Sequence, residues 1–204
     1  MNEKFFELTE EKQKTIINSA MSVFAENEYK KATTDDITKR ANISKGLLFH
    51  YFDNKKGLYL YVYKFAENFL IEKMSKSFNY EETDFFEMLI SANSAKLKIL
   101  LEYPDIFNFI IKAYFEKNEE VKTNLNIHFK NIIKSSSSKI LERADLYKFK
   151  DGVSAEKVLN LIIWASDGFM RSKFNQLIDY DKLSSEYISY LLMLKQNFYK
   201  EKYL

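Results

Sequence analysis

Residues 32–56 read ATTDDITKRANISKGLLFHYFDNKK and carry the signals for two short helices joined by a tight turn. The run Thr33-Thr34-Asp35-Asp36 places a threonine three residues before an acid, as in a capping box, so a helix is expected to start here. Asn42 stands where that helix should stop, because asparagine tolerates the left-handed conformation that turns a chain sharply. Ser44, only two residues later, can cap the next helix. The stretch is therefore predicted to form a helix-turn-helix.

The second helix of this pair has an outward and an inward side. Residues 44–47 project outward from its first turn, whereas Leu48 and Phe52 are spaced to anchor it inward. Gly46 lowers helix stability by about 1 kcal/mol relative to alanine, so it suits a place where the backbone closely approaches another surface. The wall of a DNA groove is one such surface. Taken alone, two capped helices also occur in plain helical bundles, and an aromatic run such as residues 49–52 is more often core.

The composition favours long helices and excludes several classes of protein. The chain has 204 residues, of which 46% are hydrophobic, with 4 glycines and 1 proline, so little material is left for hairpins or glycine-rich loops. There is no cysteine, and the two histidines, His50 and His128, are too few for a His-rich metal site, so neither a metal nor a cofactor is expected. A nucleotide-binding glycine loop and a nucleophile elbow are also missing. These observations predict an all-α protein that is not an enzyme.

Charge and hydropathy predict a soluble chain. The formal net charge is +2, so any DNA-binding signal must lie in local charge placement. Residues 28–56 hold seven cations and four acids, a local excess of +3. The N-terminus mixes both charge signs, and no run approaches the roughly 18 apolar residues of a membrane span. We therefore expect a cytoplasmic protein with no membrane contact.

The helix-turn-helix resembles the N-terminal signature of TetR/AcrR-type transcriptional regulators. That signature has a Thr-led helix, a turn, and a recognition helix that ends in an aromatic cluster before a lysine. The matching positions, within about residues 9–65, are Thr34, Ile37, Ala41, Ile43, Ser44, Gly46, Leu48, Phe49, His50, Tyr51, Phe52, Lys55 and Leu58. The resemblance implies an N-terminal three-helix DNA-binding domain at residues 1–54 and a C-terminal helical domain for ligand binding and dimerisation at residues 55–204.

Carried over by position, the resemblance implies nine DNA-binding residues. They are Lys45, Gly46, Leu47, Phe49 and His50 for base edges, Thr34, Tyr51 and Lys55 for phosphates, and Ser44 at the start of the recognition helix. The chemistry agrees in part, because Lys45 can donate to guanine acceptors and Leu47 or Phe49 can contact a thymine methyl. Lys55 adds a charge near a helix N-terminus that is already suited to phosphate.

Some residues depart from the family pattern. The departures are Thr38, where alanine is usual, Asn42, where glycine is favoured, and Phe49, where tyrosine is favoured. Phe49 lacks a hydroxyl that in the family often reaches a phosphate, so that backbone contact is not expected here. Arginine occurs only at Arg40, Arg143 and Arg171, so the recognition helix has no guanidinium for bidentate guanine reading. DNA shape and apolar contacts are expected to carry more of the specificity.

Hydrophobic periodicity predicts the remaining helices. A first helix should start near Thr9 and end near residues 26–28. The others are expected at residues 55–80, 84–102, 105–117, 120–143, 154–174 and 184–202, with a break at Pro104. The serines at residues 135–138 are expected to interrupt the helix at 120–143, as a bend or as a solvated face.

The resemblance also implies a small-molecule pocket among the C-terminal helices. Six aromatic residues are candidate walls, because apolar pockets are mostly lined by aromatic side chains. They are Phe107, Phe109, Tyr114, Phe115, Phe129 and Trp164. For any single one of them, filling the core is the more common role. His128 is likewise more often a hydrogen-bonded surface or core residue than an effector ligand.

The last two helices are candidates for a dimer interface. The helix at 154–174 is apolar on more than one side, and with the helix at 184–202 it could form a two-fold four-helix bundle. Gly168 would permit a close helix crossing, and Asp167 and Arg171 are spaced for an ordinary exposed ion pair. A homodimer fits a palindromic operator, because its two recognition helices must meet successive major grooves about 34 Å apart.

Two functions remain open. The favoured hypothesis is a ligand-responsive repressor that a small-molecule effector, of a kind the sequence leaves open, releases from a double-stranded DNA operator. The alternative is a helical dimeric interaction protein, or a regulator controlled by a protein partner rather than by a small ligand.

Overall fold

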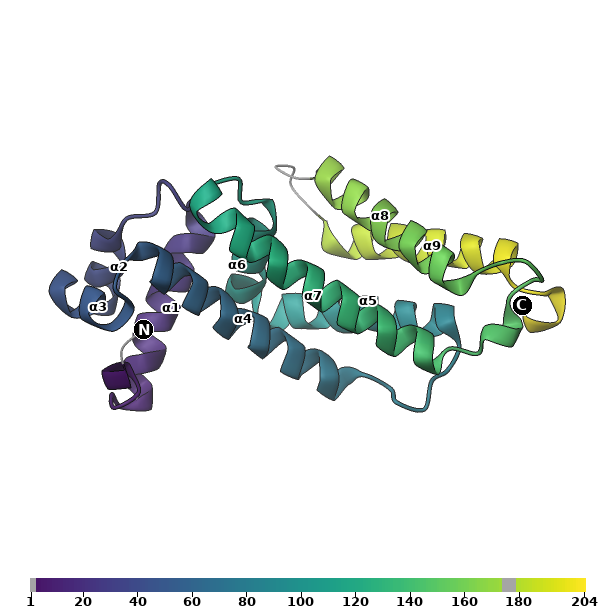
Figure 1. Ribbon diagram of the computed structural model, residues 1–204, viewed down its shortest axis with the longest axis horizontal. Helices are drawn as coiled ribbons and strands as arrows, with labels where there is room; N and C mark the ends of the chain where they lie inside the picture. Colours follow the sequence, from purple (N-terminus) through teal and green to yellow (C-terminus); the bar gives the residue numbers. More distant parts are fainter. Residues whose placement is uncertain (1–2, 174–178) are drawn as a thin grey trace. The chain divides into compact units, whose positions relative to one another are not determined.

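The prediction of an all-α fold is confirmed. The computed structural model describes residues 3–173 and 179–204, and within these ranges it contains nine α-helices and three short 3₁₀ helices but no strand (Figure 1). The helices are α1 Glu10–Glu26, α2 Thr34–Ala41, α3 Lys45–Phe52, α4 Lys55–Ser77, α5 Phe85–Glu102, α6 Pro104–Phe115, α7 Glu119–Arg143, α8 Ala155–Lys173 and α9 Tyr180–Phe198. The 3₁₀ helices are Glu3–Phe5, Leu146–Lys148 and Glu201–Tyr203. None of the described helices is long and apolar enough to cross a membrane.

The chain divides into two compact units. Unit 1 comprises residues 1–73 and 99–131, and unit 2 comprises residues 74–98 and 132–204. Unit 1 contains the whole helix-turn-helix, and unit 2 contains α8 and α9. The sequence analysis predicts a boundary at residue 54 between a DNA-binding domain and a domain for ligand binding and dimerisation. This boundary between functions differs from the two structural units and stays a prediction.

The caps expected from the sequence are present at the N-terminal helices. The Thr9 hydroxyl accepts from the amide of Lys12 at the start of α1, and the Thr33 hydroxyl accepts from the amide of Asp36 at 3.1 Å at the start of α2. The Thr33 hydroxyl also donates to the Asp36 carboxylate at 2.6 Å, so the two side chains expected to cap α2 contact each other. Asn42 adopts the left-handed conformation with φ of 51°. These local interactions end α2 and turn the chain into α3.

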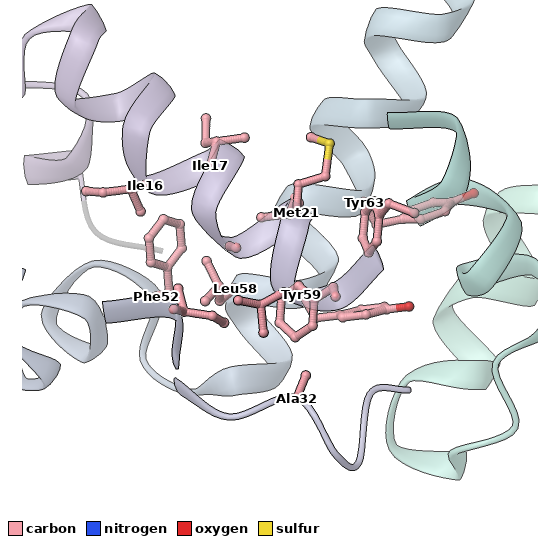
Figure 2. Packing of buried hydrophobic residues seen from close by; sticks show 14 of the residues in the cluster. Ile16, Ile17, Met21, Ala32, Phe52, Leu58, Tyr59 and Tyr63 are labelled. Atoms are coloured by element: carbon pink, nitrogen blue, oxygen red, sulfur yellow. The ribbon is translucent and has the colours of Figure 1, made fainter. Parts of the chain in front are cut away.

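Apolar side chains of α1, α2, α3 and α4, together with some of α6 and α7, form the core of unit 1. Figure 2 shows Ile16, Ile17 and Met21 of α1 near Phe52 and Leu58, all of them buried. Phe24 lies edge-on to Tyr59 with ring centroids 4.7 Å apart, which extends this core along α4. The core fixes the three N-terminal helices as one body, so the exposed side of α3 is held in a defined orientation.

The C-terminal helices differ in detail from the prediction. α7 runs without interruption through residues 135–138, where Ser135, Ser136 and Ser138 are exposed, so the expected bend is wrong and the solvated face is confirmed. α9 begins at Tyr180 rather than Ser184, because the Asp179 carboxylate accepts from the amide of Lys182 at 3.0 Å. It ends at Phe198, four residues before the predicted end at 202. Phe174, the predicted end of the preceding helix, lies outside the described residues.

Unit 2 has its own aromatic core. Phe85 and Phe86 at the start of α5 pack against Phe149 and Tyr199, with the rings of Phe149 and Tyr199 5.0 Å apart. Backbone hydrogen bonds join residue 150 to residue 198 and residue 200 to residue 148, so the chain after α9 is tied to the segment before α8. The Asp84 carboxylate lies beside this core and is the centre of a group of ion pairs.

Candidate nucleic-acid interface

The first turn of α3 presents its residues to solvent from an anchored helix. Leu48 and Phe52 are both 1% exposed and hold the inner side of α3 in the core of unit 1. On the outer side, residues 44–47 and His50 are exposed and Phe49 is half-buried. A methyl group added at Gly46 would find nothing within 4 Å, so the backbone there is open to close approach. This arrangement agrees with the two sides predicted for the helix.

Lys45 is the cation at the centre of this surface. Its ammonium forms an ion pair with the Asp35 carboxylate on α2 at 2.8 Å, with both side chains at least half exposed. Beside it lies an open pocket of about 490 Å³, lined among others by Thr34, Phe49 and Asn54. The charged side chains of the lining are Lys30, Lys45 and Lys55 together with Asp35 and Glu120, so the pocket carries charges of both signs. The ion pair therefore joins α2 and α3 at the exposed surface.

Two residues with implied phosphate roles point to internal partners instead. The Lys55 ammonium donates to the carbonyl oxygens of Tyr29 at 2.9 Å and Ala32 at 3.2 Å, and it lies over the Tyr29 ring at 4.4 Å. Tyr51 is only 5% exposed, and its ring packs edge-on against Phe5 at 5.7 Å. In this structure Lys55 supports the segment before α2 and the Tyr51 ring packs in the core of unit 1, and the phosphate contacts that the resemblance implies for them stay predictions.

Sequence reasoning missed the contacts that fix the segment between α1 and α2. The Tyr29 amide donates to the Glu116 carboxylate at the end of α6 at 2.9 Å, a contact that joins residues 87 positions apart. Arg40 on α2 donates to the Glu26 carboxylate on α1 through both of its terminal nitrogens, at 2.7 and 2.6 Å. Such distant pairs leave no local signal in the sequence. They hold α2, and therefore the pocket beside Lys45, against α1 and α6.

The six candidate pocket residues do not share one environment. Phe109 is fully buried and packs against Phe24 and Tyr59, so it belongs to the core of unit 1. Four others of unit 1, Phe107, Tyr114, Phe115 and Phe129, are half-buried. Trp164 is 69% exposed on α8 in unit 2, which puts it on the surface of that unit rather than in a pocket wall.

The expected pair of Asp167 and Arg171 is present, with the guanidinium 2.8 Å from the carboxylate. Its i,i+4 spacing on the exposed side of α8 makes it a surface ion pair, as predicted.

Comparison with known proteins identifies the family. Residues 16–62 match the profile described as bacterial regulatory proteins of the tetR family, and this range includes all nine predicted DNA-binding residues. The N-terminal part of the chain is therefore a TetR-type DNA-binding domain, and the chain as a whole is similar to TetR-type transcriptional regulators. The matched profile is that of a family of DNA-binding regulators and not of enzymes.

Curated relatives match most of the length of the chain. It is 28% identical over 170 residues to the biofilm operon icaADBC HTH-type negative transcriptional regulator IcaR of Staphylococcus aureus (strain COL), covering 79% of this chain and 84% of the relative. The IcaR of Staphylococcus epidermidis is also 28% identical, with the same shares covered.

Solved structures of similar fold match 87% or more of the chain. A TetR family transcriptional regulator from Chloroflexus aurantiacus has a TM-score of 0.63 at 20% identity and covers 98% of this chain and 99% of its own. FadR from Bacillus subtilis, solved in complex with stearoyl-CoA, has a TM-score of 0.68 at 21% identity and covers 87% and 96%. At these identities the likeness establishes the fold alone.

Proposed function

We propose that this TetR-type regulator is a repressor that binds a palindromic operator as a homodimer and leaves it when a small-molecule effector binds. The observation that carries the proposal is the exposed first turn of α3, which stands on the buried anchors Leu48 and Phe52. The repressor role is supported by the IcaR relatives, which are named negative regulators. The effector role is supported by the FadR structure, which holds stearoyl-CoA.

DNA recognition is proposed to use the outward residues of α2 and α3. Lys45 donates to guanine, and Leu47 and Phe49 contact thymine methyl groups. His50 reaches a base edge, while Thr34 at the α2 N-terminus meets a phosphate. Ser44 keeps α3 capped through its 3.1 Å hydrogen bond from the Leu47 amide, and Gly46 lets the backbone approach the groove. With one lysine and no arginine on the exposed turn, shape and apolar contacts are expected to carry much of the specificity.

The Lys45→Ala substitution tests this assignment. Loss of a guanine-reading lysine is expected to weaken binding to the operator by about ten- to hundredfold, which corresponds to about 1–3 kcal/mol. The measurement is fluorescence anisotropy with the promoter DNA next to the gene of the regulator, at fixed salt. Lys14→Ala on α1 is the matched control, because Lys14 is also an exposed lysine paired with a carboxylate, at 3.3 Å from Glu10. Equal affinities of the two variants would contradict the role of Lys45.

The dimer is proposed to form through the outer faces of α8 and α9. Leu161 and Trp164 on α8 and Leu192 and Met193 on α9 are exposed apolar side chains of unit 2. Burying such residues between two copies is favourable by roughly 25 cal/mol per Å² of apolar surface, and a two-fold interface uses the same patch on both chains. This face is therefore the expected contact between the two subunits.

A charge placed on this face should separate the subunits. The Trp164→Glu variant is expected to shift from dimer to monomer in light scattering and to lose most operator affinity, because each monomer then binds one half-site. Leu146→Glu is the control, since Leu146 is also exposed in unit 2 but lies on neither helix. A dimeric Trp164→Glu variant would contradict this interface. A wild-type dimer without sequence preference in a random-duplex selection would favour the protein-partner alternative.

A further inference from the structure

The short 3₁₀ helix ahead of α1 packs into the DNA-binding part of the chain. Phe5, its last residue, is fully buried, although the adjacent Phe6 is 56% exposed. The side-chain amide of Gln13 on α1 donates to the carbonyl oxygens of Phe6 at 3.3 Å and Leu8 at 2.9 Å. These hydrogen bonds hold the segment against α1, and only one of its two neighbouring aromatic rings is turned inward.

The Phe5 ring lies at the C-terminal end of α3. Its centroid is 4.9 Å from that of Phe52 and 5.7 Å from that of Tyr51, and these are the last two residues of α3. It also lies edge-on to Tyr61 of α4 at 5.5 Å. Edge-on aromatic pairs have a preferred geometry, so they constrain orientation as well as burying apolar surface. The ring of Phe5 therefore joins the end of α3 to α4.

The position of α3 depends on contacts with its neighbours. A helix of eight residues is only marginally stable alone in water, so tertiary contacts decide where it lies. Its N-terminal end is fixed by the Ser44 cap and by the ion pair of Lys45 with Asp35. Phe5 supplies ring contacts at the opposite end. The segment before α1 thus contributes to the orientation of the helix that carries most of the proposed base contacts.

The ring contacts continue from Phe5 to the exposed face of α3. The Tyr51 ring, which meets Phe5, also lies 5.8 Å from the ring of His50. His50 is exposed, and it is one of the residues proposed to reach a base edge. A movement of the Tyr51 ring is therefore expected to displace His50. A single ring separates the buried N-terminal segment from a proposed base-reading side chain.

We propose that Phe5 is a positioning residue for operator recognition, which sets the orientation of α3 through Tyr51 and Phe52 without touching DNA. This inference rests on the proposed function, because it adds a residue that holds the proposed base contacts in place. Base contacts need a fixed helix orientation, whereas the attraction to phosphates is the same for any sequence. Loss of the ring leaves a cavity beside the end of α3, and it lowers the preference for the operator more than the general attraction to DNA.

A comparison of two DNAs separates this role from a loss of stability. Fluorescence anisotropy with the full-length protein gives the affinity for the promoter DNA next to its gene and for a random duplex of the same length, at fixed salt. Phe5→Ala is expected to lower the ratio of these affinities by about tenfold, as the loss of one base contact does. Partial unfolding lowers both affinities equally and leaves their ratio unchanged. An unchanged ratio would overturn the proposal.

Two matched controls and a conservative variant accompany this measurement. Leu125 on α7 is 1% exposed in the same core, so Leu125→Ala also lowers stability, and Phe6→Ala alters the exposed neighbouring ring. Both controls should keep the wild-type ratio. Phe5→Leu retains apolar volume but lacks the ring edges, so we expect an intermediate fall of about threefold, which is measurable even where Phe5→Ala fails to fold. An equal fall in Leu125→Ala would contradict a special role of Phe5.

The imidazole signals of His50 give a second measurement on the protein without DNA. The chain has two histidines, His50 on α3 and His128 on α7, so an NMR spectrum reads each of them separately. Phe5→Leu is expected to shift the signals of His50 and to leave those of His128 in place, and unchanged His50 signals would refute the proposal. A wild type without operator preference would count against the proposed function instead, and this spectrum would still decide whether Phe5 positions α3.

Discussion

Replacing Asp84 by alanine is expected to destabilise unit 2 by about 1–3 kcal/mol, because the variant removes the cap of α5 and one carboxylate partner from each of two partly buried lysines. The loss stays below that of a fully unpaired buried charge, since Lys148 keeps Asp145 at 3.1 Å and Lys195 keeps Glu87 at 2.7 Å. Asp84 is 7% exposed, and its carboxylate lies 3.0 Å from the Lys148 ammonium and 3.5 Å from that of Lys195. It also accepts from the amides of Phe86 and Glu87, which caps the start of α5. One side chain therefore joins α5, the segment before α8, and α9.

Urea unfolding followed by circular dichroism, at equal protein concentration, measures this effect. The matched control is Asp151→Ala, since Asp151 also pairs with a lysine, Lys200 at 3.0 Å, but is 97% exposed. Its removal should change the free energy of unfolding by less than about 1 kcal/mol. Similar losses in the two variants would show that the buried position of Asp84 has no special energetic weight.

The same carboxylate gives unit 2 a defined dependence on pH. Burial alone would raise the pKa of Asp84, but the hydrogen bond from Lys148, the amide of Glu87 and the charges of both lysines outweigh it, and the pKa is lowered. A carboxyl with a lowered pKa in the folded state stabilises the fold above its unfolded pKa of about 4, and this contribution is lost as the pH falls through the folded value. The wild type should lose stability below about pH 4, more steeply than Asp84→Asn.

The parts of the fold that the sequence predicts well depend on neighbouring residues. The caps at Thr33, Asn42 and Ser44 act on backbone groups only a few residues away. Their pattern therefore determines where α2 starts and ends and where α3 starts, independently of how the helices pack. The start of α9 was predicted four residues late because the sequence offers several polar residues near it. Only the hydrogen bond between the Asp179 side chain and the Lys182 amide identifies the one that caps the helix.

The parts of the site that the sequence predicts poorly depend on distant contacts. Tyr51 follows Leu48 by three residues, so helical spacing already puts it on the buried side, whereas the family resemblance assigned it to a phosphate. Lys55 shows the same limit, since its partners at residues 29 and 32 become neighbours only after α1, α2 and α4 have packed. Trp164 is aromatic and in a helix, and nothing in its local pattern separates a pocket wall from an exposed face.

The Lys55→Ala variant distinguishes two roles for Lys55. The resemblance implies a phosphate contact, whereas the structure supports a hold on the segment before α2. If its ammonium serves chiefly to hold the carbonyls of Tyr29 and Ala32, Lys55→Ala leaves two acceptors without their charged donor. We expect a loss of about 1.5–3 kcal/mol in the free energy of unfolding of unit 1. Operator affinity should also fall at least about tenfold, because the segment before α2 then loses its support and Thr34 loses its position.

The salt dependence of binding distinguishes the two roles. A direct phosphate contact would lower the slope of log affinity against log salt by about 1 in Lys55→Ala, whereas a supporting role leaves the slope unchanged. Lys56→Ala is the neighbouring control for stability and should unfold like the wild type. A variant with wild-type stability and a reduced salt slope would show that Lys55 contacts a DNA phosphate directly. Lost stability with an unchanged slope would instead establish that this lysine shapes the DNA-binding surface from within the protein.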